Sequence, residues 1–275
     1  MDELYVKSRR ALLDALEALE DHRDGLILVG AQAIYLYTGE ADVPIATRTK
    51  DSDLVLDPSL LQENPLLEQA MAGADFHRNL ESGQPGEWLD AEEIPVDLLV
   101  PESLGGRGGR RGARIPPHSK HAARKVAGLE AALVDNERRT IKALDPDDSR
   151  SIRMKVAGPA ALSVAKAYKL GERLANPKRL INEDAHDLYR LLRATETEEV
   201  GERYRLLLND DRSRAVAHQA LIYLEELFTE PSSLGSQMAG QAEGSVGDPD
   251  LVAVSTSALV NDLIVSLRIA EASQR

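Results

Sequence analysis

Apolar runs, glycine turns and helical patterns alternate over the first half of the chain. Residues 2–22 carry an amphipathic pattern with one leucine stripe, which is typical of a helix. The apolar run 26–29 ends at Gly30, and residues 31–37 form a second helical stretch that ends at Gly39. This order predicts a helix, a strand, a glycine turn and a further helix.

Alternation with a period of two follows, and it predicts strands. Polar and apolar residues alternate over residues 51–57, which predicts a strand with two different faces. Residues 94–100 form a second predicted strand, which is more apolar than the first. A helix is expected between them over residues 60–71. Weaker strands are expected at residues 76–80, 86–89, 131–134, 140–144 and 152–156.

The pattern becomes helical from Gly158 onward. Helices are expected at residues 159–174, 183–193, 197–208, 212–228 and 251–271. Pro159 suits a first helical turn, Asn182 suits a helix cap, and the Gly-, Ser- and Gln-rich residues 231–250 suit a flexible loop. The chain therefore divides into an α/β domain with a mixed sheet over residues 1–157 and an all-α domain over residues 158–275.

Composition excludes several classes of protein. The chain has 275 residues, which suffice for one large domain or two moderate ones, and it contains no cysteine. Disulfides, thiolate catalysis and Cys-based zinc sites are therefore excluded, and a reducing cytoplasm is the expected location. No secretory signal is evident, and the continuous apolar runs are shorter than the ~20 residues that cross a bilayer, so no membrane partner is expected.

Charge is unevenly distributed. The formal net charge is -13, which argues against a general nucleic-acid coat protein. Residues 103–129 nevertheless contain no acid and seven basic residues. Five glycines occur among residues 105–112, so the basic segment 105–114 is predicted to be a mobile loop. It is suited to grip a nucleic-acid acceptor or the nucleotide itself, and the alternative is a disordered, solubilising loop.

Three aspartates carry the strongest chemical signal. Asp51 and Asp53 stand at i and i+2 on one predicted strand and therefore point to the same side, roughly 7 Å apart at Cα. Asp97 lies on another strand among apolar neighbours, where an ionised acid needs a partner. Hard carboxylate oxygens are the ligands that Mg²⁺, or Mn²⁺, prefers, and such ions support phosphoryl displacement. The alternative is that these acids merely face solvent.

A second set of charges lies on two predicted helices. Lys166, Lys169 and Arg173 recur at i, i+3 and i+7 and share one helix face. Their anionic partner is either nucleotide phosphate or the pair Asp184 and Asp187 on the next helix. The alternative is a solvated face with ordinary ion pairs of little energetic value.

A family resemblance rests on several of these motifs. The run Leu-Val-Gly-Ala-Gln-Ala-Ile-Tyr-Leu over residues 28–36, followed by Arg-Thr-Lys-Asp-Ser-Asp-Leu over residues 48–54, resembles the opening of the nucleotidyltransferase superfamily. It is most similar to the AbiEii-type nucleotidyltransferase toxins of bacterial toxin–antitoxin systems. The resemblance continues through Ala-Lys-Ala-Tyr-Lys at 165–169 and Asp-Ala-His-Asp-Leu-Tyr at 184–189, covering roughly residues 25–195.

The resemblance implies roles for individual residues. The turn at Gly30 and Ala31, where the family usually has Gly-Ser or Gly-Gly, would contact the triphosphate, as would Thr49. Asp51 and Asp53 would bind the metal, and Asp97, expected from its apolar surroundings to need a partner, would complete the metal set. The nucleotide-binding and catalytic residues expected on the helices are Lys166, Lys169, Asp184 and Asp187.

The resulting functional hypothesis is a metal-dependent nucleotidyltransferase. It would move a nucleoside monophosphate from a nucleoside triphosphate to an acceptor, with Asp97 accepting the acceptor's proton. By resemblance, the acceptor would be tRNA and a cognate antitoxin would restrain the activity. Two alternatives stay open: a transferase for a small molecule or a protein, and a catalytically silent nucleotide-binding module.

Overall fold

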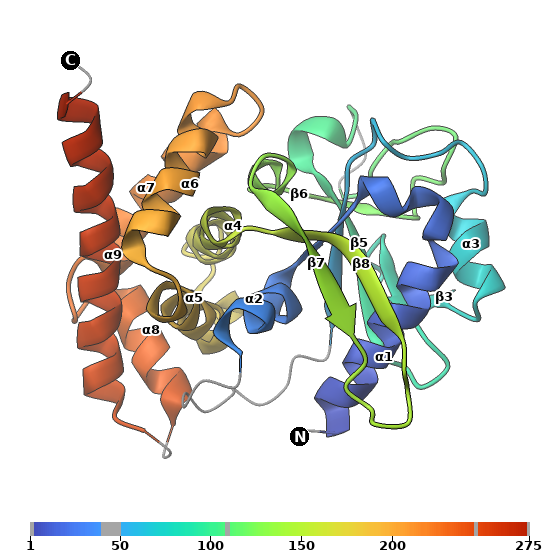
Figure 1. The fold of residues 1–275 in the computed structure, drawn as a ribbon, viewed down its shortest axis with the longest axis horizontal. Coiled ribbons are helices and arrows are strands. Elements are labelled where there is room, and N and C mark those ends of the chain that lie inside the picture. The colour runs from blue at the N-terminus through green and yellow to red at the C-terminus, as the bar shows by residue number, and fades with distance from the viewer. Residues whose placement is uncertain (1–2, 40–50, 108–110, 245–246, 274–275) are drawn as a thin grey trace. The chain divides into compact units, whose positions relative to one another are not determined.

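A computed structural model describes residues 3–39, 51–107, 111–244 and 247–273 (Figure 1). The chain forms two compact units. The first comprises Met1–Ala33 and Arg48–Ala157, and the second comprises Ile34–Thr47 and Gly158–Arg275. Thr49 and the centre of the basic segment, residues 108–110, lie outside the described residues, so the predictions made for them remain predictions.

The first unit is built on a mixed sheet of eight strands, which confirms the predicted α/β class. The strand order is β3-β4-β5-β2-β1-β8-β7, with β6 pairing to β5. The strands are β1 (Leu26–Val29), β2 (Ser52–Leu56), β3 (His77–Arg78), β4 (Glu87–Leu89), β5 (Pro95–Pro101), β6 (Arg124–Val126), β7 (Asn136–Lys142) and β8 (Ser151–Ala157).

Helices and short 3-10 turns accompany these strands. The helices are α1 (Glu3–Ala18), α2 (Gly30–Thr38) and α3 (Leu67–Gly73), and the 3-10 turns are Glu20–Gly25, Glu102–Leu104 and Glu130–Leu133. Helix α1 packs on β2 and β5 through a stripe of fully buried leucines, Leu12, Leu13 and Leu16. Burial of each such side chain contributes roughly 1.5–3 kcal/mol, so this stripe holds α1 to the central strands.

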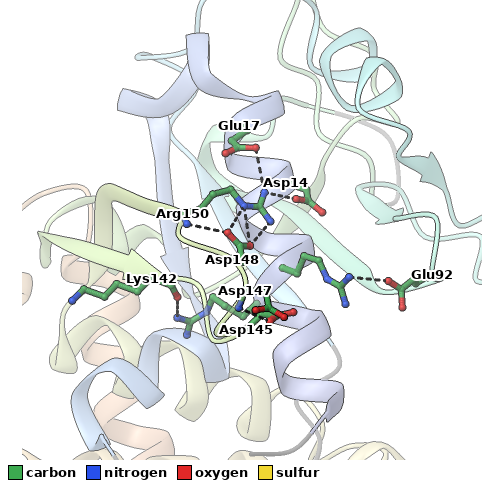
Figure 2. A network of polar contacts seen from close by, with 10 residues as sticks. Asp14, Glu17, Glu92, Lys142, Asp145, Asp147, Asp148 and Arg150 are labelled. Carbon is green, nitrogen blue, oxygen red and sulfur yellow. Dashed lines mark hydrogen bonds and ion pairs between the residues drawn. The ribbon is translucent and has the colours of Figure 1, made fainter.

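An ion-pair network fastens the β7–β8 turn to α1 (Figure 2). The Arg150 guanidinium lies 2.8 Å from a carboxylate oxygen of Asp148 and also contacts Asp14 and Glu17 of α1. The hydrogen bond from Arg150 to Asp148 and the charge of Asp14 raise the pKa of Arg150 above its ordinary value. The edge of the sheet is therefore tied to the helix that covers its centre.

The second unit is an all-α bundle (Figure 1). Its helices are α4 (Pro159–Gly171), α5 (Asn182–Ala194), α6 (Thr197–Asn209), α7 (Arg214–Phe228), α8 (Leu234–Glu243) and α9 (Pro249–Ser273), with a 3-10 turn at Pro177–Arg179. Pro159 stands in the first turn of α4, as predicted. The cap of α5 is Ile181 rather than Asn182, and its side chain makes no capping bond.

Helix α9 is long and apolar. Residues Pro249–Ile269 satisfy the length and composition of a membrane span, with a mean hydropathy of 1.5, so the prediction that no stretch reaches this length was too strict. In the most apolar 18-residue stretch of this helix, 44% of the residues are buried in the protein. Helix α9 packs on α6, α7 and α8. The core helix of a bundle meets the same test, so these properties alone are weak evidence for a membrane span.

Three further local predictions were wrong. Residues 231–250 were expected to be a loop, but Leu234–Glu243 form α8. The small residues there allow close packing: a Cβ at Gly235 would lie 2.6 Å from the Phe228 ring, and one at Gly240 would overlap the Pro249 carbonyl. Low side-chain volume in this segment therefore serves helix contact rather than flexibility.

The other two errors concern short apolar stretches. Residues 131–134 were expected to be a strand but lie in a buried 3-10 turn, because a short apolar run carries no periodicity that separates the two. The helix expected over residues 60–71 begins only at Leu67. Pro65 precedes it, and a proline that lacks an amide donor disrupts a helix interior.

Candidate metal centre

Adjacent strands of the first unit bring three aspartates together. Asp53 on β2 is the direct register partner of Asp97 on β5, and the two strands run parallel. Asp51 immediately precedes β2, two residues before Asp53. One carboxylate oxygen of each of the three lies within 4.8 Å of the others. The predicted convergence of acids from two separate strands is thus present in the fold.

This cluster suits a hard divalent cation. Oxygens on opposite sides of an octahedral Mg²⁺ stand about 4.2 Å apart, so small side-chain rotations bring the three oxygens to coordination distance. Asp97 supplies the more specific observation. It is only 6% exposed, and its Oδ1 has no hydrogen-bond partner within the described part of the chain. A buried carboxylate oxygen without a partner is costly, and a bound cation removes that cost.

Asp97 has one cationic neighbour, Arg124 of β6. The Arg124 Nη2 donates to Asp97 Oδ2 at 2.5 Å, while Arg124 Nη1 is buried and has no partner among the described residues. Burial raises the pKa of Asp97, and the negative charges of Asp51 and Glu87 raise it further, while Arg124 opposes this shift. Burial lowers the pKa of Arg124, but the hydrogen bond and charge of Asp97 outweigh it. One arginine therefore faces a group of carboxylates, and the site stays electronegative.

Gly30 makes room for the cluster. Its φ of +71° lies in the left-handed region that favours glycine. A Cβ at this position would overlap a carboxylate oxygen of Asp53. Two features therefore require glycine at residue 30: the left-handed backbone angle and the close approach of the Asp53 carboxylate. Ala31 follows in the first turn of α2.

A buried polar network supports the start of β2. The Gln32 Nε2 donates to Ser52 Oγ at 2.6 Å and to Ser8 Oγ at 2.8 Å. Arg9 Nε donates to Gln32 Oε1 at 2.7 Å, and Ser52 Oγ donates to the Ser8 carbonyl. Ser52 stands between Asp51 and Asp53, so this network holds the backbone that presents both acids.

Sequence reasoning missed these supporting residues. Gln32 was visible as a polar residue in an otherwise apolar run, and burial of such a group requires partners. Arg124 was counted among the seven basic residues of 103–129 but not singled out. Its pairing with Asp97 depends on the parallel alignment of β5 with β6, which no local pattern reveals.

The second unit gathers the other predicted charges. Lys166 Nζ lies 2.9 Å from Asp184 Oδ1 and 2.7 Å from Asp187 Oδ2. Lys169 Nζ lies 2.9 Å from Asp184 Oδ1, and Arg173 lies 3.2 Å from Asp184 Oδ2. Three cations and two carboxylates thus join α4, α5 and the segment between them.

The charges of this cluster stabilise one another. Burial opposes the charged form of Lys166, but the negative charges of Asp184 and Asp187 outweigh it and raise the pKa of the ammonium. Burial also opposes the charged form of Asp184, yet Lys166 and Lys169 lower the pKa of this carboxyl. The Lys166 and Asp184 side chains are only 7% and 4% exposed, so these ion pairs are poorly screened by solvent.

The sheet, the glycine turn and the acid cluster on neighbouring strands form an α/β fold with a group of carboxylates that could hold a divalent cation. Comparison with known families agrees: residues 8–209 match the model of a family described as Nucleotidyltransferase. The chain belongs to this nucleotidyltransferase family. No curated protein and no solved structure matches it.

Proposed function

We propose that this nucleotidyltransferase uses Mg²⁺ or Mn²⁺ to move a nucleoside monophosphate from a nucleoside triphosphate to tRNA. The observation that carries the proposal is the register of Asp53 with Asp97, together with the partnerless Oδ1 of buried Asp97. A bound divalent cation would polarise the triphosphate and neutralise its developing charge. Asp51, Asp53 and Asp97 are the residues that would hold it.

The chain's own side chains divide the remaining tasks. An acceptor hydroxyl oxygen forms a bond to the α-phosphorus, the bond from that phosphorus to the bridging β-phosphate oxygen breaks, and pyrophosphate leaves. Asp97 would receive the hydroxyl proton as general base. Arg124 holds the other Asp97 oxygen, and its partnerless Nη1 can donate to a phosphate oxygen.

We further propose, from the family resemblance, that Gly30, Ala31 and Thr49 contact the triphosphate. Lys169 would steady a phosphate while Asp187 orients it or the ribose, with Lys166 and Asp184 binding nucleotide beside them. Lys169 is the accessible member, with a side chain 41% exposed. Lys169→Gln leaves Asp184 paired with Lys166 and Arg173, so an increase in KM for the nucleotide without loss of stability would support this role. An unchanged KM would refute it.

The transfer test uses the purified chain, Mg²⁺, each α-labelled nucleoside triphosphate in turn, and total tRNA. Label on RNA supports the proposal. Label on the protein or on a small molecule would identify a different acceptor, and nucleotide binding without any transfer would identify a catalytically silent nucleotide-binding module. Asp53→Asn serves as the inactive control, because it keeps the side-chain shape and removes one ligand charge.

The resemblance to AbiEii-type toxins also supports a toxin role in the cytoplasm, restrained by a cognate antitoxin. The test is induced expression of the wild-type chain and of Asp53→Asn in a bacterial host. Growth arrest by the wild type alone would support the role. Equal growth of both strains, at equal protein levels and with transfer activity present in lysates, would contradict it.

A further inference from the structure

A basic cavity of about 610 Å³ lies in the first unit beside β6. Arg111, Arg114, Lys120 and His121 contribute to its wall, with Gly112 and Pro85 among the smaller lining residues. No acid lines it. Within the described part of the chain, Arg111, Arg114 and Lys120 form no ion pair, so their charges are not neutralised by the fold. Such a cavity in a chain of net charge -13 calls for an anionic ligand.

The wall of the cavity is held by backbone hydrogen bonds rather than by the side chains that line it. Gly112 forms an antiparallel bridge with Arg124, and the Lys125 amide donates to the Arg111 carbonyl at 2.7 Å. A Cβ at Gly112 would overlap the Lys120 carbonyl, so glycine allows the two segments to close on each other. The basic side chains therefore remain available for a ligand.

The same backbone contacts place the cavity next to the metal centre. The Leu98 amide, one residue beyond Asp97, donates to the Gly86 carbonyl at 2.7 Å, and the Gly86 amide donates to the His121 carbonyl at 3.0 Å. Since Gly112 bridges Arg124 of β6 and β6 pairs with β5, the cavity wall lies about two strand spacings, or ~10 Å, from β5.

The cavity lies on one side of the three aspartates, and the glycine turn lies on the other. In the sheet, β1 and its Gly30 turn adjoin β2, whereas β6 adjoins the far side of β5. A triphosphate bound at Gly30 would therefore approach from the β1 side. On that far side β4 pairs with β5 at Asp97, β6 pairs with β5 from Leu99 onward, and Arg124 of β6 reaches back to Asp97. An acceptor bound in the basic cavity would therefore approach Asp97 from the β6 side.

We propose that this cavity binds the sugar-phosphate backbone of an RNA acceptor close to its reacting end. Arginine and lysine recognise phosphate by charge and hydrogen bonding, and no aromatic side chain lines the cavity except the His121 imidazole. Recognition is therefore independent of base sequence and sensitive to salt. This inference deepens the proposed transfer to tRNA, but RNA binding can be measured without any turnover.

The experiment measures the affinity of a 5′-labelled, single-stranded octaribonucleotide of mixed sequence by fluorescence anisotropy, without nucleotide, over 50–200 mM salt. The variant is Arg114→Gln with Lys120→Gln, and the matched control is Lys178→Gln with Arg179→Gln, which removes two exposed charges from the second unit. Binding of a fluorescent nucleoside triphosphate with Mg²⁺ is measured in parallel on all three proteins.

The expected result is about tenfold weaker RNA binding by the cavity variant at 50 mM salt, with a salt slope shallower by about 1.4 for the two lost phosphate contacts. Nucleotide affinity and the control variant stay at the wild-type value. Weaker nucleotide binding with unchanged RNA binding would assign the cavity to the triphosphate and overturn the inference. Three other results would also overturn the inference. The control variant loses as much RNA affinity as the cavity variant, the cavity variant binds both ligands like the wild type, or the wild type does not bind RNA.

Failure of the proposed reaction gives a different pattern. A wild-type chain that transfers no nucleotide to tRNA, but binds the oligonucleotide through Arg114 and Lys120, would refute the transferase proposal and leave the cavity assignment intact. Conversely, transfer to tRNA by the wild type, with RNA binding unchanged in the cavity variant, would overturn the cavity assignment alone.

Discussion

The two units of this protein differ in how many cationic partners surround a buried carboxylate. In the first unit, Asp97 shares its site with Asp51 and Asp53, has one arginine partner and keeps one oxygen without any partner among the described residues. In the second unit, Asp184 is contacted by Lys166, Lys169 and Arg173. One cluster has excess negative charge, and the other supplies its own countercharges.

This difference separates a carboxylate cluster that could hold a cation from a cluster whose charges the fold already pairs. Burial raises the pKa of Asp97, whereas its lysine partners lower the pKa of Asp184 despite burial. A ligand that neutralises the first cluster should therefore gain affinity from charge that the fold leaves uncompensated. Removal of buried charge from the second cluster should affect folding, in addition to the nucleotide contacts proposed for its residues. Substitutions in the first cluster are thus expected to lower activity with little loss of stability, whereas substitutions in the second cluster should lower stability.

The largest expected effect is on activity, from Asp97→Asn. This change removes a metal ligand and the proposed proton acceptor, and a loss of about 10³-fold in kcat/KM follows from the several kcal/mol that such groups contribute. The amide oxygen can still accept the Arg124 hydrogen bond, so unfolding free energy changes by only about 1–2 kcal/mol. Steady-state transfer assays and urea unfolding measure the two quantities. Near-normal transfer by the variant would remove Asp97 from the mechanism.

For Lys166→Met, the main expected effect is a loss of stability. Loss of the buried ammonium leaves Asp184 and Asp187 short of countercharge, and breaking a buried pair in this way costs about 3–5 kcal/mol. Chemical denaturation of the variant measures the loss.

The control for this change is Lys178→Met, an exposed lysine of the same unit. Adding Asp184→Asn and Asp187→Asn to Lys166→Met should recover part of the stability, because no buried carboxylate is then left without the Lys166 ammonium. A Lys166→Met protein as stable as the wild type would show that the second cluster is not structural.

An intermediate effect is expected of Gly30→Ala, in both stability and metal affinity. The left-handed φ costs about 1–3 kcal/mol for a non-glycine residue, and the added Cβ overlaps the Asp53 carboxylate. Gly39→Ala is a matched control, because Gly39 has a φ of +57° with nothing within 4 Å of an added Cβ. Isothermal titration calorimetry should show weaker Mn²⁺ binding by the Gly30→Ala variant and wild-type Mn²⁺ binding by the Gly39→Ala variant. Equal Mn²⁺ affinity in both variants would rule out the crowding of Asp53.

The smallest expected effect is the acid dependence contributed by Asp184. Its folded pKa is lowered, so its stabilisation is complete above the unfolded value of about 3.9 and is lost as pH falls toward the folded pKa. The stability gap between wild type and Asp184→Asn should be constant above about pH 5 and narrow below about pH 4. Urea midpoints between pH 2.5 and 6 test this, and a gap that widens in acid would reverse the assigned direction.

Local sequence was enough to locate most elements. Period-two alternation located β2 and β5, and the glycine at residue 30 marked the turn into α2. Local sequence predicted secondary structure poorly where a segment was judged by its amino-acid composition and not by hydrophobic periodicity. The small residues of α8 resembled a loop, because glycine in a sequence does not reveal whether it serves flexibility or close packing against Phe228 and Pro249.

The candidate site was only partly predictable for a similar reason. The types and spacing of Asp51, Asp53 and Asp97 indicated a cation site, because carboxylates on one strand face must share their surroundings. Arg124, by contrast, contacts Asp97 only through the pairing of β5 with β6. The need for glycine at residue 30 was expected from phosphate approach, but the structure adds the crowding of Asp53.

The sequence by itself determined most of the helices and strands, the α/β character and the three acids, because these follow from periodicity and residue type over a few neighbouring positions. Tertiary structure decided which charges are compensated. Register between β2 and β5 placed Asp53 beside Asp97, and the contact of α4 with α5 enclosed Lys166 between two carboxylates. These outcomes depend on burial and on distances between residues far apart in the chain, which set the electrostatic energy of each charge and appear in no local pattern.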